Sequence, residues 1–263
     1  IDVARKPVER RHQHLLNQRI DNFLKCRSDH HTDRKIHGVP LERKCTKFLP
    51  HLHGLKLRAT FGTMRREESD ILEFKLRVDS QRKIAKTLVA FANGLGGQIV
   101  VGVRDSGSVA GCRVDEEFYM IQGAAQLHTR PEVPISAREE RWEHKSVLVV
   151  EIPPSSLAPH LAHDEDEDLW RAYVRRGAAN YKANRVLLES ISLKFTGVVK
   201  ATSDQLRLLH LMNASEPVSA SLLARKSGLP IRDVEDGLAV LVRWGQVVAT
   251  PVEQGWRYRP SEM

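Results

Sequence analysis

One stretch of the sequence, residues 67–111, constrains the fold more than any other part of the chain. Residues 71–75 alternate apolar and charged side chains, which is the period of a half-buried strand. Residues 79–92 then place apolar side chains at helical spacing. A glycine-containing segment, residues 93–97, leads into an apolar run that begins at Ile99. The stretch therefore predicts the order strand, helix, glycine turn, strand.

The position of the glycines argues against a phosphate-binding loop. Such loops lie between a strand and the N-terminus of the next helix, whereas Gly94, Gly96 and Gly97 follow the expected helix. The sequence also lacks the Gly-Lys-Ser/Thr loop of nucleotide-binding ATPases. We expect these glycines to end the helix and form a tight turn, because only glycine takes positive φ at little cost.

The residues that follow predict an α+β domain with one main sheet. Helical spacing is found over residues 115–127 and 185–193. The expected strands cover residues 135–141, 146–152 and 171–176. The acidic run over residues 164–168 is expected to be a solvated loop.

These blocks together resemble the Schlafen AlbA_2 domain, which occurs in bacterial proteins described as transcriptional regulators and in animal Schlafen proteins. The matching residues are Glu68-Ser69, Leu72-Glu73-Phe74-Lys75, Ala90-Phe91-Ala92-Asn93, Gly96-Gly97, Ile99 to Val103, Asp105, Gly107, Gly111, Tyr173 to Ala178, Ala183 and Leu187-Leu188. The resemblance implies a mixed sheet with flanking helices over residues 64–195.

The resemblance also implies an alternative activity, a metal-dependent endoribonuclease. Three acidic residues are proposed to act with divalent metal in animal Schlafen nucleases, and the corresponding positions here are Glu68, Glu73 and Asp105. Carboxylates suit Mg²⁺ or Mn²⁺, which can activate water. A shared site requires Glu68 to lie before the strand, since residues five apart in a strand face opposite sides. The opposing interpretation is that Glu73 pairs with a neighbouring cation, that Asp105 forms a turn with Gly107 and that there is no cofactor.

A second unit, residues 196–263, predicts three helices followed by a hairpin. Helices are expected to begin near residues 202, 219 and 230, and a hairpin is expected over residues 247–250 and 255–259. This order resembles the winged helix-turn-helix, commonly a DNA reader whose third helix enters the major groove. The third helix carries Asp233, Glu235 and Asp236, which would repel phosphates. The hairpin, with Trp256 and Tyr258 beside its arginines, is therefore the expected contact surface.

The positive charge is concentrated before these two units. Residues 1–63 hold 14 of the 41 Lys/Arg and 6 of the 33 Asp/Glu, so they carry the whole net charge of +8. They also hold seven of the twelve histidines, but in no zinc-binding spacing. We interpret them as a basic, His-rich extension that is poorly ordered or lies upstream of a natural start at Met64. A basic arm that contacts nucleic acid is the alternative.

The functional prediction is a nucleic-acid-binding protein, most simply a DNA-binding transcriptional regulator. RNA is the alternative partner, a non-enzymatic assembly module is a third hypothesis, and a homodimer stays open. The candidate nucleic-acid contacts are Lys75, Lys86, Arg175, Arg176, Lys182, Arg225, Lys226, Arg257 and Arg259.

The compartment is predicted from the cysteines and from hydropathy. Three scattered cysteines do not resemble a disulfide framework, so we expect a reducing, cytoplasmic environment. No apolar run approaches the ~18 residues of a membrane span, and we expect no membrane partner.

Overall fold

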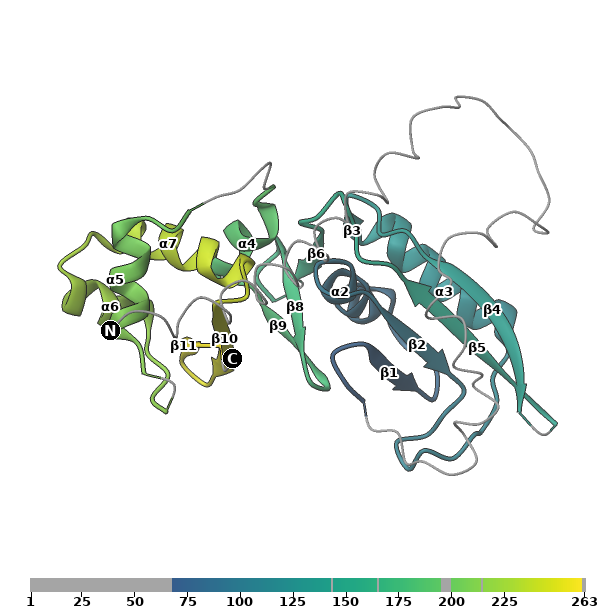
Figure 1. The fold of residues 1–263 in the computed structure, drawn as a ribbon. Coiled ribbons are helices and arrows are strands. Elements are labelled where there is room, and N and C mark those ends of the chain that lie inside the picture. The colour runs from purple at the N-terminus through teal and green to yellow at the C-terminus, as the bar shows by residue number, and fades with distance from the viewer. Residues whose placement is uncertain (1–67, 143, 165, 195–199, 214, 262–263) are drawn as a thin grey trace. The chain divides into compact units, whose positions relative to one another are not determined.

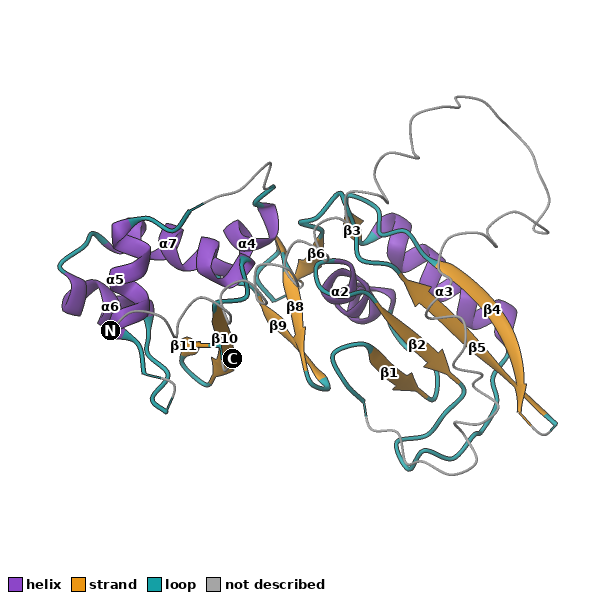
Figure 2. Ribbon diagram, viewed as in Figure 1, coloured by secondary structure: helices purple, strands orange, loops and turns teal. Residues whose placement is uncertain are grey.

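The computed structural model describes residues 68–142, 144–164, 166–194, 200–213 and 215–261 (Figures 1 and 2). They form six helices and eleven strands, and they all lie within one compact unit, Leu57–Met263. The expectations about residues 1–63 lie outside the described residues. Mixed helices and strands confirm the predicted α+β class.

The main sheet has four strands in the order β1-β2-β5-β4. Its strands are β1 (Leu72–Lys75), β2 (Gly97–Val101), β4 (Ser136–Trp142) and β5 (Lys145–Ile152). The first two strands are parallel and the remaining neighbours are antiparallel. The predicted strand, helix, turn, strand order is therefore present, with its two strands side by side.

Two helices share one core with this sheet: α2 (Gln81–Ala92) and α3 (Val114–Leu127). Ser80 caps α2 by accepting a hydrogen bond from the backbone of Lys83, which satisfies a helix-end donor. The core includes Leu88, Phe91 and Ile121, all fully buried. Burying each such side chain contributes about 1.5–3 kcal/mol to folding.

The glycines after α2 make the predicted turn. Gly96 has φ +77°, and a Cβ added to it would lie 2.7 Å from the Ile152 carbonyl oxygen. A Cβ on Gly97 would lie 2.5 Å from the Phe91 ring. Only glycine fits here, because the helix must turn directly onto the sheet.

The region after the main sheet departs from the prediction. It contains β3 (Thr129–Arg130), β6 (Leu161–Asp164), β7 (Leu169–Arg171), β8 (Tyr173–Arg176) and β9 (Ala179–Lys182). Strands β3, β6 and β7 form one small sheet, and β8 and β9 form another. The single strand expected over residues 171–176 is thus two strands in different sheets. The strands β6, β7 and β9 were not predicted, because strands of three or four residues are too short to show an alternating pattern.

The last part of the chain contains four helices and a hairpin among its described residues. They are α4 (Arg185–Ser192), α5 (Ser203–Leu211), α6 (Ala220–Ser227), α7 (Ile231–Arg243), β10 (Val247–Val252) and β11 (Gly255–Pro260). Thr202 and Gln205 form a reciprocal capping box at the start of α5. The left-handed Gly228 ends α6, with φ +71°.

A second hydrophobic core joins α4 to these elements. It contains Val186 and Leu187 of α4 together with Leu238 and Leu241 of α7 and Tyr258 of β11. The sequence placed helix α4 in the predicted domain of residues 64–195, but in the structure α4 packs with the C-terminal elements. The boundary at residues 195 and 196 stays a prediction.

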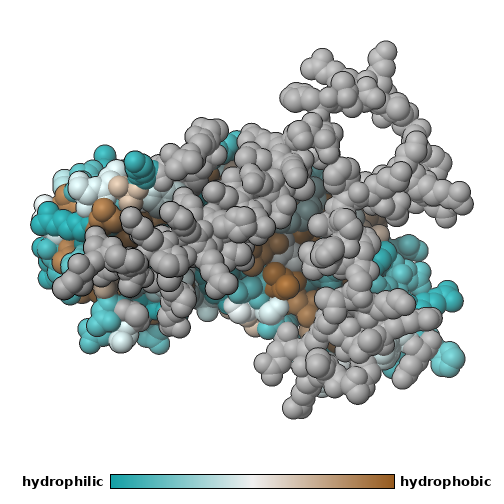
Figure 3. All heavy atoms as spheres, viewed as in Figure 1, coloured by the Kyte–Doolittle hydropathy of each residue, from teal (hydrophilic) through white to brown (hydrophobic). Residues whose placement is uncertain are grey.

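The surface is mainly hydrophilic where described atoms can be seen. Figure 3 shows apolar side chains in small groups among hydrophilic ones. None of the described helices is both long and apolar enough to cross a bilayer.

Candidate nucleic-acid interface

The glutamate of the first strand is buried in an ion pair. Glu73 on β1 and Arg175 on β8 are each 4% exposed, and Arg175 Nη2 lies 2.5 Å from Glu73 Oε2. Glu73 Oε2 accepts no hydrogen bond from the described residues, so this contact is ionic. Glu73 Oε1 lies 2.5 Å from Lys75 Nζ. The interpretation that Glu73 pairs with a neighbouring cation is confirmed. Arg175 was a candidate contact for a nucleic-acid phosphate, but its side chain is buried.

Glu68 and Arg175 also close the outer edge of the main sheet. The Lys75 carbonyl accepts hydrogen bonds from Gly102 and Val103, directly after β2. Because backbone groups alternate in direction along a strand, those of Leu72 and Phe74 point away from β2. The Phe74 N–H donates to Glu68 Oε1 over 3.1 Å, and Arg175 Nη2 donates to the Leu72 carbonyl over 3.2 Å. These side chains satisfy backbone groups that an open edge would expose.

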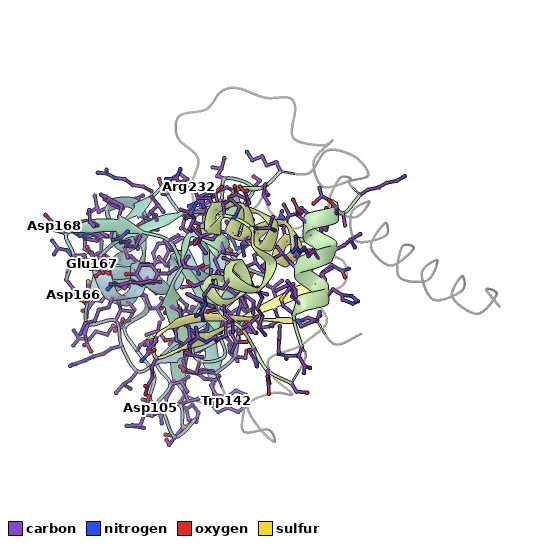
Figure 4. The ribbon with its side chains drawn as sticks, turned by 90° about the vertical axis from the view of Figure 1, so that its left-hand side faces the viewer. Asp105, Trp142, Asp166, Glu167, Asp168 and Arg232 are labelled. Carbon is purple, nitrogen blue, oxygen red and sulfur yellow. The ribbon has the colours of Figure 1, made fainter. Side chains whose placement is uncertain are left out.

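The three acidic residues of the nuclease alternative do not form a metal-binding group. Within the described part of the chain, no three His, Cys, Asp or Glu side chains lie close enough to hold a metal ion. Asp105 is exposed in the turn after β2 and points outward (Figure 4). That turn is closed by the Gly107 N–H, which donates to the Arg104 carbonyl, and not by the Asp105 side chain.

Two lysines proposed as phosphate contacts instead hold a buried carboxylate. Asp164, the first residue of the run expected to be a solvated loop, has no exposed surface. Its Oδ2 lies 2.6 Å from Lys182 Nζ. The Tyr173 hydroxyl donates to the same oxygen over 3.0 Å, and Lys86 Nζ lies 3.4 Å from Oδ1. The Lys182 ammonium, followed by the other donors, holds the pKa of Asp164 far below its ordinary value. Glu167 also accepts from Lys182, over 2.8 Å.

The blocks that carry these contacts lie in a stretch that matches a family model. Residues 68–184 match the family model described as Schlafen, AlbA_2. We call residues 68–184 the AlbA_2 segment. The ion pair of Glu73 and Arg175 and the Asp164 network both lie inside it.

Solved structures with similar coordinates share little sequence with this chain. A crystal structure of the DIP2311 protein from Corynebacterium diphtheriae is 16% identical with a TM-score of 0.40, and the match covers 76% of this chain and 37% of that chain. A solution structure from Nitrosomonas europaea, the N-terminal domain of a protein described as ATP-dependent DNA helicase RecG-related, is 19% identical with a TM-score of 0.32. That match covers 55% of this chain and 90% of the domain. No curated protein matches the sequence.

The cationic side chains predicted to contact nucleic acid from the C-terminal elements differ in solvent exposure. Arg225 and Lys226 are exposed in the last turn of α6. Arg257 and Arg259 are half-buried on one face of β11. Arg176, at the end of β8 in the AlbA_2 segment, donates from Nε to the Ala249 carbonyl over 3.3 Å. The α6 pair is therefore the best exposed of the proposed contacts beyond the AlbA_2 segment.

The two aromatic residues of the hairpin are buried. Trp256 donates from Nε1 to the Lys182 carbonyl over 3.1 Å, and the Tyr258 hydroxyl accepts from Asn184 Nδ2 over 2.7 Å. Burial raises the pKa of Tyr258 to about 12. Both side chains attach the hairpin to the end of the AlbA_2 segment and to α4, and neither is open to a nucleic acid.

Two exposed arginines on α7 were not among the predicted contacts. Arg232 lies in the first turn and Arg243 in the last (Figure 4 shows Arg232). Eleven residues make about three turns, so both arginines lie on nearly the same side of the helix. This spacing is visible in the sequence, but the neighbouring acidic residues obscured it.

Proposed function

We propose that this chain binds nucleic acid through its C-terminal elements and acts as a DNA-binding transcriptional regulator. The single observation that carries the proposal is the arrangement of α5, α6, α7 and the β10–β11 hairpin. An antiparallel bridge between Val218 and Tyr258 adds a further strand position between α5 and α6. Helix, strand, helix, helix and hairpin is the order of a winged helix-turn-helix.

The charges on this arrangement support the proposal. Arg225, Lys226, Arg232 and Arg257 form no ion pair with any residue in the described part of the chain. Cations that form no ion pair among the described residues can neutralise phosphates and release counterions, which gives binding that falls steeply with salt. The AlbA_2 segment offers less, because Lys75, Lys86, Lys182 and Arg175 all have carboxylate partners.

The nuclease alternative has weaker support from the geometry. It would need Glu73 to leave Arg175 and Lys75 before it could bind a divalent ion. A homodimer is a further proposal. The place for it is β4, the edge strand opposite β1, whose own edge Glu68 and Arg175 close.

The proposal is tested by measuring how the full chain binds duplex DNA, single-stranded DNA and RNA at two salt concentrations with Mg²⁺ present. We expect duplex binding that weakens with salt while all nucleic acids stay intact. The double variant Arg225→Ala/Lys226→Ala should weaken binding and lower the salt slope by about 0.9 for each phosphate that the protein no longer neutralises. Lys83→Ala/Arg104→Ala removes two exposed charges from the AlbA_2 segment and is the matched control.

The outcomes separate the candidates. A larger loss of affinity in the control variant than in the α6 variant would move the interface to the AlbA_2 segment. RNA cleavage that is abolished by a chelator would favour the nuclease. Absence of binding to all three nucleic acids would refute the proposal.

A further inference from the structure

One arginine of α4 binds both acidic residues that face it from α7. Arg185 Nη1 lies 2.7 Å from Glu235 Oε2, and Arg185 Nη2 lies 2.7 Å from Asp236 Oδ1. The two nitrogens of one guanidinium are thus shared between adjacent carboxylates. This forked contact fixes the orientation of the guanidinium more closely than a single surface ion pair would.

The backbone around Arg185 holds it in place. It is the first residue of α4, directly after Asn184, whose side chain accepts from the Leu187 N–H and donates to the Tyr258 hydroxyl. The next residue, Val186, is fully buried in the core shared with α7. Arg185 is therefore anchored on both sides, which reduces the entropy lost in holding its side chain against α7.

The fork changes the charge of the helix that a winged helix presents to DNA. The start of α7 carries Arg232 against Asp233, Glu235 and Asp236. With Arg185 these side chains carry two positive and three negative charges, a sum of −1, and without Arg185 the sum is −2. The three carboxylates would then repel phosphates at the helix N-terminus, which otherwise attracts anions. Arg185 pairs with both carboxylates that follow Arg232 within one turn and offsets one of their two negative charges.

We propose that Arg185 is a positioning residue for nucleic-acid binding, which masks Glu235 and Asp236 so that Arg232 can approach a phosphate. The inference rests on the proposed function and names the residue that makes α7 compatible with it. The acidic residues that seemed to argue against DNA binding serve an internal contact.

The test removes the charges of the fork from the two helices in the full chain. Arg185→Gln should weaken duplex binding roughly tenfold at low salt, a change equivalent to ~1.4 kcal/mol. The effect should shrink as salt rises, because it comes from exposed like charges. Adding Glu235→Gln and Asp236→Asn to Arg185→Gln should restore binding, although the ion pairs are still absent. A purely structural role of Arg185 would not be rescued in this way.

Arg113→Gln provides the matched control. Arg113 forms an exposed ion pair with Glu116 at the start of α3, so its removal also leaves a carboxylate in the first turn of a helix. We expect its affinity to equal that of the wild type. Equal or tighter duplex binding by Arg185→Gln would overturn the inference while leaving the proposed function intact. Wild-type protein that binds no nucleic acid would overturn both, and that result is seen before any variant is made.

Discussion

Glu73 on β1 and Arg175 on β8 form a buried ion pair whose side chains are 5% and 2% exposed. The pair joins the edge of the main sheet to the two-stranded β8–β9 sheet. The sequence offered Glu73 as a candidate metal ligand and Arg175 as a candidate phosphate contact. In the structure the two residues instead stabilise the AlbA_2 segment.

We expect Arg175→Ala to lower the free energy of unfolding by about 3–5 kcal/mol, because it leaves a buried carboxylate without its main partner. Urea denaturation measures the change, with Arg113→Ala as the exposed control. Nucleic-acid affinity, corrected for the folded fraction, should be unchanged. Normal stability together with weakened binding would instead indicate that Arg175 contacts a phosphate.

Asp164 should make the protein sensitive to acid. Its folded pKa lies below the ordinary value of 3.8, so as the pH falls the unfolded chain takes up a proton first. The stability from Asp164 is full above about pH 4 and is lost as the pH falls further toward the folded pKa. Asp164→Asn should be less stable at pH 7 and should lose less on acidification. Parallel stability curves for variant and wild type between pH 3 and 7 would contradict this.

His160 should cause a second loss of stability on acidification, at a higher pH than the loss caused by Asp164. The ring is fully buried, and burial lowers its pKa below the ordinary 6.5. Its Nδ1 must donate to the Pro131 carbonyl, 2.8 Å away, so Nε2 accepts from the Ser155 hydroxyl at 2.6 Å. The unfolded chain binds a proton first, so stability falls as the pH drops below about 6.5. Thermal unfolding between pH 5 and 8 should show this slope in wild type and not in His160→Gln.

Gly97 should tolerate no side chain. Gly97→Ala would place its Cβ 2.5 Å from the Phe91 ring, and the forced repacking should cost about 1–3 kcal/mol of unfolding free energy. Gly94→Ala is the control, since its Cβ would meet its nearest neighbour, the Ala90 carbonyl oxygen, at 3.3 Å. Equal stability of the two variants would show that the ring can move aside.

Local patterns in the sequence were enough to predict most of the elements. Apolar spacing located α2, α3 and α7, and the glycines after α2 predicted the turn onto β2. These signals are local, because side-chain periodicity and positive φ depend on neighbouring residues. The strands β6 and β7 were not predicted, since four and three residues are too few to show a period.

Only the tertiary structure decided what the charged residues do. The sequence contained Glu73, Asp164 and Glu235, but nothing near them showed that Arg175, Lys182 and Arg185 would be their partners. A carboxylate in a sequence can bind a metal, face water or pair with a distant cation. The choice depends on burial and on which cation the fold brings within about 4 Å, because the energy of a charge depends on its distance from others and on its access to water.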